Sequence, residues 1–153
     1  MEYRKSAITD CEKIYLLVCD LEGRVLPFEK FKEIYSEQVR SKNYYCIVGE
    51  ENNQILAFLN LRFEEQLHHC ESIAEIMEFA VHSACRSQGI GKQMFEKAVQ
   101  VAETYGCTQM EVACNQLRTD THRFYLREGM SNFHYKFSQR LTGEILSENA
   151  LGR

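Results

Sequence analysis

A strand-like run that passes through two closely spaced glycines into a long helix restricts the fold of this chain more than any other feature. Residues Ile73 to Val81 are mostly apolar, and the helical spacing of apolar residues predicts a helix from Ile90 to Tyr105. Gly89 and Gly91 stand at the junction. Glycines let the backbone approach a ligand closely, and free N–H groups at a helix start attract anions. The junction therefore predicts an anion site that suits a pyrophosphate, although a simple tight turn would explain the two glycines equally well.

Two familiar glycine-rich motifs do not fit this junction. A dinucleotide-binding fingerprint would need glycine at position 94, where the chain has Met94. A Walker A loop would need glycine at position 86 and Ser or Thr at position 93, which are Arg86 and Gln93. A strand, a short turn and a helix start remain, with Arg86 and Lys92 adding positive charge.

The other segments alternate between strand and helix patterns. The predicted elements are a strand Tyr3–Ile8, a helix capped by Thr9 or Asp10 and ending at Gly23, a helix from Pro27 to Val39, a hairpin from Tyr44 to Phe63, the strand and helix above, a strand Met110–Cys114, a helix Asp120–Arg127 and a last strand Asn132–Leu141. The order β-α-α-β-β-β-α-β-α-β indicates an α/β (α+β mixed) fold, with a central, mixed, mostly antiparallel sheet and helices on both faces. We expect one domain over residues 1–141 and a polar tail over 142–153.

Charge and hydropathy exclude several classes of protein. The formal net charge is −4, and the basic residues are scattered, which argues against a nucleic-acid partner. The longest apolar run, Ile14 to Cys19, is far too short for a membrane span, and the first residues lack a signal-peptide core. The expectation is therefore a cytoplasmic protein with no nucleic-acid and no membrane partner.

The cysteines do not indicate a disulfide framework or a structural metal. There are seven, an odd number, and none forms a C-x-x-C pair. His68, His69 and Cys70 are adjacent, but neighbouring residues on a strand point to opposite faces. No second cluster has zinc-ligand spacing, so we expect no metal.

Two motifs resemble those of the GCN5-related N-acetyltransferases, the GNAT superfamily. The sequence R-S-Q-G-I-G at residues 86–91 is similar to the family signature R/Q-x-x-G-x-G/A, and it lies after the predicted fourth strand. The sequence HRFYLREGM at residues 122–130 resembles the F-Y-x-x-x-G-F segment, with Asn115 ahead of it. Ser87 and Met130 depart from the commoner glycine and phenylalanine without threatening the fold. The resemblance covers residues 1–141.

Within the superfamily the chain is most similar to aminoalkylphosphonate N-acetyltransferases. The similar segments are LHH at 67–69, EIMEFAV at 75–81, HRFYLREG at 122–129 and FHYKFSQRL at 133–141. The resemblance implies the GNAT fold, acetyl-CoA as the acyl donor and pairing of its pantetheine arm with the backbone of the fourth strand. The residues that it implies for cofactor binding are Phe79, Ala80, Val81, Arg86, Ser87, Gln88, Gly89, Ile90, Gly91, Lys92, Asn115 and Tyr125.

Acyl transfer from a thioester to an amine needs a base for the amine and a proton for the departing thiolate. The resemblance implies that Tyr125 supplies the proton; the alternative is a tyrosine packed in the core beside Phe124. Glu75 and Glu78 are the candidate bases, because a carboxylate in an apolar strand should have a raised pKa. Strict alternation puts them on opposite faces unless a bulge intervenes, and we favour Glu75 narrowly. Either glutamate could instead be a surface residue or an ion-pair partner.

The acceptor is less constrained. Cationic side chains at Arg62, His68, His69, His134 and Lys136 could meet a phosphonate, and of these we expect His68, His69 and Lys136 to bind the substrate. Acidic residues on the first two helices, Glu22, Glu29 and Glu33, would suit a polyamine equally well.

The predicted function is acetyl transfer from acetyl-CoA to a primary amine of a small molecule, with an aminoalkylphosphonate as the narrower candidate. The reaction is direct attack in a ternary complex. The alternatives are a protein, peptide or polyamine N-acetyltransferase and a catalytically silent acyl-CoA-binding module. Because members of the family often dimerise, a homodimer is also expected.

Overall fold

The computed structural model describes residues 1–141 and divides into two compact units, Met1–Val112 and the part that begins at Ala113. Each unit is described by itself. The elements of the first unit are β1 (Glu2–Lys5), a 3-10 turn (Ile8–Asp10), α1 (Cys11–Glu22), α2 (Phe28–Arg40), β2 (Tyr44–Glu51), β3 (Gln54–Gln66), β4 (Glu71–Val81), a second 3-10 turn (Ser83–Cys85), α3 (Ile90–Thr104) and β5 (Gln109–Val112).

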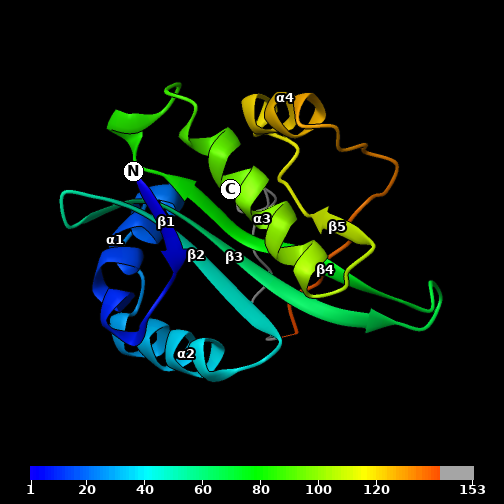
Figure 1. Ribbon diagram of the computed structural model, residues 1–153, viewed down its shortest axis with the longest axis horizontal. Coiled ribbons are helices and arrows are strands. Elements are labelled where there is room, and N and C mark those ends of the chain that lie inside the picture. Colours follow the sequence, from blue (N-terminus) through cyan, green and yellow to red (C-terminus); the bar gives the residue numbers. More distant parts are fainter. Residues whose placement is uncertain (142–153) are drawn as a thin grey trace. The chain divides into compact units, whose positions relative to one another are not determined.

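The five strands form one sheet in the order β1-β2-β3-β4-β5 (Figure 1). The first four are antiparallel neighbours, and β5 runs parallel to β4. The turn between β2 and β3 places Asn52 and Asn53 at φ angles of 51° and 60°, the left-handed conformation that a two-residue hairpin turn requires. The sheet is therefore mixed and mostly antiparallel, as predicted.

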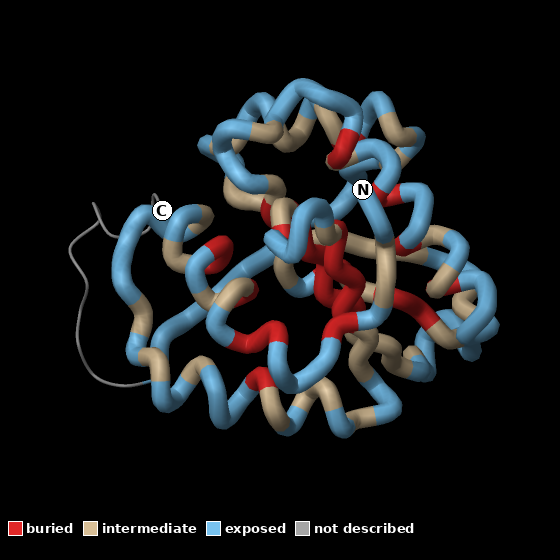
Figure 2. Tube along the Cα trace, turned by 60° about the vertical axis from the view of Figure 1, so that its left-hand side comes forward, coloured by how far each residue is buried: buried red, intermediate tan, exposed pale blue. Residues whose placement is uncertain are grey.

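Helices cover both faces of this sheet. On one face, Ile14 of α1 and Tyr35 of α2 pack in one buried cluster with Phe58 of β3. On the other face, Met94 of α3 is fully buried, and a Cβ added at Gly49 of β2 would lie 3.4 Å from its Cε atom. Figure 2 shows the buried segments, in red, gathered where strands and helices meet. The alternation of side chains along the strands thus supplies two apolar layers.

The predicted first strand is shorter than expected because Ile8 belongs to the turn that follows it. Asp10 does not cap α1 through its side chain. Its carboxylate instead accepts two hydrogen bonds from the Arg4 guanidinium, at 2.7 and 2.9 Å, and one from the Ala7 N–H at 2.8 Å. Burial of this carboxylate explains the difference, because an ionised group away from water needs a charged partner.

The second unit contains α4 (Thr119–Arg127), which agrees with the predicted short helix. Gly129 follows it at a φ of 91°, the left-handed conformation that suits a helix end. None of the helices over residues 1–141 is long and apolar enough to cross a membrane.

The predicted last strand over Asn132–Leu141 is wrong for the described structure, where these residues form no regular element. Phe133, Tyr135 and Phe137 are 85%, 81% and 91% exposed. Alternating aromatic residues suit a strand, but a strand also needs a neighbour for its backbone hydrogen bonds. Over residues 1–141, no strand pairs with this segment.

Candidate functional site

The pairing between β4 and β5 ends in the middle of β4. The parallel pairing of β4 with β5 runs only from Ile73↔Gln109 to Ile76↔Val112, whereas β4 continues to Val81. The residues from Met77 to Val81 therefore have no partner in β5. A strand edge of this kind can pair with an extended ligand through its backbone N–H and C=O groups. Phe79, Ala80 and Val81 lie on this stretch.

A bulge places Glu75 and Glu78 on the same face of the sheet. Glu78 is paired with Asn60 of β3, and Glu75 is paired with Arg62, because the register shifts between Asn60 and Leu61. Asn60 and Arg62 are two residues apart on β3 and so point to the same side. Strict alternation of side chains would put the two glutamates on opposite faces. The extra residue in β4 shifts this alternation by one position, so that both lie on the same face.

Glu75 is held by an ion pair. Its Oε2 atom lies 2.5 Å from an Arg62 guanidinium nitrogen, and the same nitrogen lies 3.0 Å from Oε2 of Glu64. The Glu75 side chain is 19% exposed. Of the roles considered from the sequence, this geometry matches that of an ion-pair partner.

Glu78 has a different environment. Burial raises the pKa of its carboxyl group, and the negative charge of Glu22 acts in the same direction. A hydrogen bond from Asn60 Nδ2 to Glu78 Oε2, at 2.9 Å, opposes that rise in pKa by stabilising the ionised form. A partly desolvated carboxylate with a raised pKa is a better proton acceptor near neutral pH than an ordinary surface glutamate.

The loop after β4 is shaped by bonds within itself. The Arg86 Nε atom donates to the carbonyl of Val81 at 3.2 Å, and Gln88 Nε2 donates to the carbonyl of Ala84 at 3.3 Å. Ser87 and Gly89 have φ angles of 62° and 82°. These left-handed residues turn the chain sharply into α3.

The start of α3 fits a bound anion. Gly89 is its N-cap residue and makes no side-chain cap hydrogen bond, so the first N–H groups of Ile90, Gly91 and Lys92 have no side-chain cap. An uncapped helix start carries a positive dipole end. The residues present fit the pyrophosphate of acetyl-CoA, and its binding at this helix start stays a prediction.

The two basic residues of the loop have acidic neighbours of their own. The Arg86 guanidinium lies 3.9 Å from the Asp20 carboxylate of α1, and Lys92 lies 3.9 Å from Glu96. Both basic side chains are more than half exposed. Pairs of this kind are weak, so either side chain can turn toward a bound anion at little cost.

In the second unit, Asn115 organises the approach to α4. Its side-chain oxygen accepts from the Leu117 N–H at 2.8 Å, and its carbonyl lies 2.8 Å from Nε2 of His122. Tyr125 is 8% exposed. Burial, reinforced by Cys114, raises the pKa of the Tyr125 phenol, so the group is protonated at neutral pH.

The candidate substrate-binding residues of the first unit, His68 and His69, lie away from Glu78 along the sheet. His68 and His69 lie in the turn between β3 and β4, before the first residue of β4. At about 3.3 Å per residue, that turn is roughly 20 Å or more from Glu78. The binding of substrate by these two histidines therefore stays a prediction, at a distance from Glu78 along β4. Lys136 lies in the segment that forms no strand.

No metal site appears in the part of the chain that the structure describes. Residues 1–141 hold no group of three or more His, Cys, Asp or Glu side chains arranged to bind an ion. All seven cysteines have free thiols.

Sequence reasoning missed Asn60 and Gln38. Asn60 Nδ2 donates to Oε1 of Gln38 as well as to Glu78, both at 2.9 Å. The available signal was one amide in the apolar run from Ile55 to Leu61. Gln38 gave no signal, because it lies on an ordinary polar helix face.

Comparisons with known proteins agree with this geometry. The model of the Acetyltransferase (GNAT) family matches residues 11–130. The chain is 31% identical over 140 residues to aminoalkylphosphonate N-acetyltransferase of Salmonella typhimurium, which covers 92% of this chain and 91% of that protein.

Solved structures have the same fold. A crystal structure described as a transcriptional regulator from Bacillus halodurans C-125 matches at a TM-score of 0.84 and 26% identity, over 91% of this chain and 98% of that one. Glucosamine-6-phosphate N-acetyltransferase from Arabidopsis thaliana matches at a TM-score of 0.76 and 24% identity, over 92% and 97% of the two chains.

The protein therefore belongs to the GNAT family of acetyltransferases. It is an acetyl-CoA-dependent N-acetyltransferase, as the sequence predicted.

Proposed function

We propose that this protein acetylates the primary amine of a small molecule, with an aminoalkylphosphonate as the first candidate, by direct attack of the amine in a ternary complex. The observation that carries the proposal is the half-buried carboxylate of Glu78, whose pKa is raised, on the stretch of β4 that continues past β5 toward the anion-binding loop. The relative from Salmonella supports the choice of acceptor.

The cofactor is held by two features of the first unit. The end of β4, which continues past its pairing with β5, accepts the pantetheine arm as an added strand, and the uncapped start of α3 at Gly89 accepts the pyrophosphate. When bound, acetyl-CoA supplies an acyl group activated as a thioester. Asn115 and Tyr125 complete the set of residues that the family resemblance assigns to this cofactor.

Two residues move protons in this mechanism. The Glu78 carboxylate takes a proton from the ammonium group of the acceptor, directly or through one water, which leaves a neutral amine with a free lone pair. The Tyr125 hydroxyl holds the proton that the departing thiolate needs. Glu75 remains paired with Arg62 and keeps that arginine fixed.

The test is acetyl-CoA turnover with a panel of amines, followed by the mass of the product. The panel contains aminoalkylphosphonates, polyamines, amino acids, aminoglycosides and a lysine peptide. Thiol-reactive dyes are avoided, because the chain has seven cysteines. Preference for the phosphonates, at least tenfold in kcat/KM over the matching carboxylates, would support the proposed acceptor. Preference for a polyamine or the peptide would overturn it, and tight acetyl-CoA binding without turnover of any amine would indicate a silent module.

A further inference from the structure

Asn60 is a buried amide at the centre of an apolar strand. It is 5% exposed, and its neighbours Leu59 and Leu61 are fully buried. A buried amide of this kind is unfavourable unless its polar atoms are hydrogen-bonded. The buried side-chain amide of Asn60 should therefore have specific hydrogen-bond partners.

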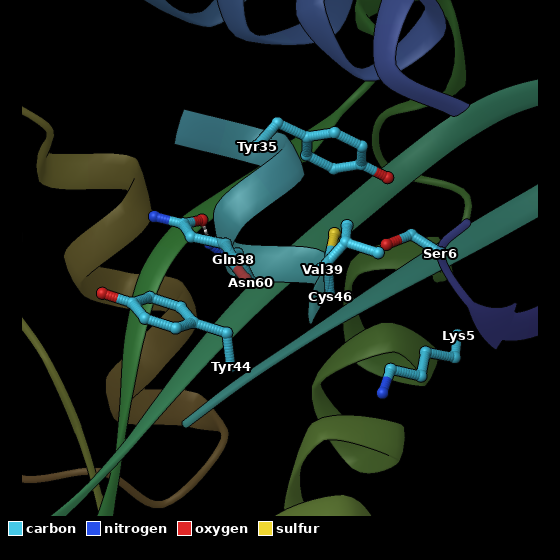
Figure 3. Close-up of a pocket in the computed structure, with 8 residues that line it drawn as sticks. All are labelled: Lys5, Ser6, Tyr35, Gln38, Val39, Tyr44, Cys46 and Asn60. Atoms are coloured by element: carbon cyan, nitrogen blue, oxygen red, sulfur yellow. Dashed lines mark hydrogen bonds between the residues drawn. The ribbon is translucent and has the colours of Figure 1, made fainter. Parts of the chain in front are cut away.

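Both N–H groups of the Asn60 side chain can be assigned to acceptors. One bond reaches Oε2 of Glu78 on β4, and the other reaches Oε1 of Gln38 on α2, both at 2.9 Å. The close-up in Figure 3 shows the Gln38 side chain turned toward Asn60, with the bond between them dashed. The amide thus bridges an α2 side chain and a β4 carboxylate.

The side-chain oxygen of Asn60 is the one polar atom of this amide that has no assigned bond. Among the residues that the structure describes, Oδ1 of Asn60 has no hydrogen-bond partner. Asn60 also lines a cavity of about 10 Å³, together with Ser6, Tyr35 and Tyr44 (Figure 3). A cavity of that size has room for about one water molecule.

The two acceptors fix which way the amide points. An ionised carboxylate and an amide oxygen can only accept hydrogen bonds, so the NH₂ group of Asn60 must face both of them. If the amide turned over, its oxygen would face two other oxygens, and Glu78 would have to be protonated to donate. With its oxygen toward Asn60, Gln38 therefore opposes the turned-over amide that would go with a protonated Glu78, and that state would require the Gln38 amide to turn over as well.

We propose that Asn60 is a positioning residue for Glu78, and that Gln38 fixes the orientation of Asn60, so that the pair holds the Glu78 carboxylate ionised and aimed. The catalytic consequence rests on the proposed role of Glu78 as the base. The other group that acts on Glu78 is Glu22 at the end of α1, and Glu78 in turn helps to raise the pKa of the Cys46 thiol of β2. Burial and the charge of Glu22 both favour protonated Glu78, whereas the hydrogen bond from the Asn60 amide favours ionised Glu78.

The test measures Glu78 directly by NMR titration of protein labelled with ¹³C at the glutamate carboxyl carbons, with Glu78→Gln to assign the signal. In Asn60→Ala, we expect the midpoint of the Glu78 titration to rise by about one pH unit, because a hydrogen bond to a charged group is lost. Gln38→Met keeps the volume and removes the acceptor, and should raise the midpoint by less. Gln93→Met on α3 is the matched control and should leave it unchanged. Gln38 is only half-buried, so this variant remains informative if Asn60→Ala does not fold.

An unchanged midpoint in a folded Asn60→Ala or Gln38→Met variant would overturn the proposal. If the midpoint rises, the acid limb of the kcat/KM profile with the best amine should move to higher pH by the same amount. If the NMR midpoint rises while Glu78→Gln retains full turnover, the positioning of Glu78 stands, and its role as the base fails.

Discussion

Burial raises the pKa of both Glu78 and Tyr125, with opposite chemical consequences. A carboxyl group with a raised pKa becomes a stronger base when ionised, whereas a phenol with a raised pKa stays protonated as a proton donor. The same physical cause therefore produces an acceptor in one unit and a donor in the other.

The first residue to test is the base. We expect Glu78→Gln to lower kcat/KM by about 10²- to 10⁴-fold at neutral pH and to remove the acid limb of the pH profile. Glu75→Gln should have a smaller effect, because it disturbs Arg62 rather than the proton transfer. Steady-state kinetics from pH 5 to 9 measure kcat/KM for both variants and show which glutamate is the base. A larger loss in Glu75→Gln than in Glu78→Gln would reverse the assignment.

The proton donor is tested separately. In Tyr125→Phe, kcat should fall by about 100-fold, while the Kd for acetyl-CoA changes little, because the ring that packs in the unit is kept. Phe124→Leu, next to it on α4, controls for packing and should retain most of the turnover. Turnover of Tyr125→Phe at the normal rate would remove this tyrosine from the mechanism.

Glu78 also has a predictable effect on stability. Because its folded pKa is raised, the folded state holds the proton more tightly, so stability falls as pH rises from the ordinary glutamate value through the folded one. Glu78→Gln should therefore stabilise the protein more at pH 7 than at pH 4. Thermal unfolding of both proteins at the two pH values provides the measurement, and an equal difference at both would contradict it.

At the scale of elements, the loop between β4 and α3 combines a strained turn with an exposed helix start. Gly89 has a φ of 82°, and open space surrounds the position of its missing Cβ. A side chain there meets no neighbouring atom, so the glycine is required by the backbone conformation rather than by lack of room.

Gly89→Val should weaken acetyl-CoA binding by at least 100-fold, because a β-branched residue avoids a positive φ and the first-turn N–H groups move. Gly106→Val at the other end of α3 is the matched control: its φ is 76° and it also has free space. Both variants should lose about 1–2 kcal/mol of stability. Calorimetric titration with acetyl-CoA measures the affinity of each variant. Equal affinities would show that the loop is not part of the cofactor site.

The ion pair that joins β1 to the turn before α1 gives a second element-scale test. The Arg4 guanidinium lowers the pKa of Asp10, so the stability from this pair is complete above the ordinary aspartate pKa and is lost as pH falls through the folded value. We expect Asp10→Ala to lower the free energy of unfolding by about 2 kcal/mol at pH 7, since Arg4 is partly exposed. Glu33→Ala, which breaks an exposed pair with Lys30, should change it by less than about 0.5 kcal/mol. Similar losses in urea unfolding would contradict the distinction.

At the scale of the whole molecule, residues 133–141 leave large apolar side chains in water. Phe133, Tyr135, Phe137 and Leu141 are each more than 80% exposed. Large apolar side chains exposed along one segment are typical of interaction surfaces. Together with the family resemblance, they support the expectation of a homodimer.

Light scattering after size-exclusion chromatography tests that expectation. We expect a mass near twice that of one chain, and a shift toward the single-chain mass when Phe133 and Phe137 are both changed to Ser. Ile8→Ser and Val25→Ser, at exposed apolar positions of the first unit, serve as controls. A single-chain mass at all protein concentrations would refute the dimer.

Most of the elements could be predicted from the sequence, because they depend on local properties. Apolar spacing marked α1 and α3, and the glycines at positions 23 and 106 marked the ends of these helices. The glycine pair after β4 likewise predicts an anion-binding loop, and with the F-Y segment it identified the family. Each of these signals lies within a few consecutive residues.

The arrangement around the glutamates could not be predicted, because it depends on how separate strands are paired. One extra residue in β4 brings Glu75 and Glu78 to the same face, and neighbouring strand β3 then gives Arg62 to the first and Asn60 to the second. The same reasoning explains the missing strand over residues 132–141: its alternating pattern is local, but a strand exists only with a paired neighbour. The sequence alone therefore determined the fold class and the family, and it predicts the cofactor loop, whereas only the tertiary structure decided which glutamate is ion-paired and which is half-buried with a raised pKa.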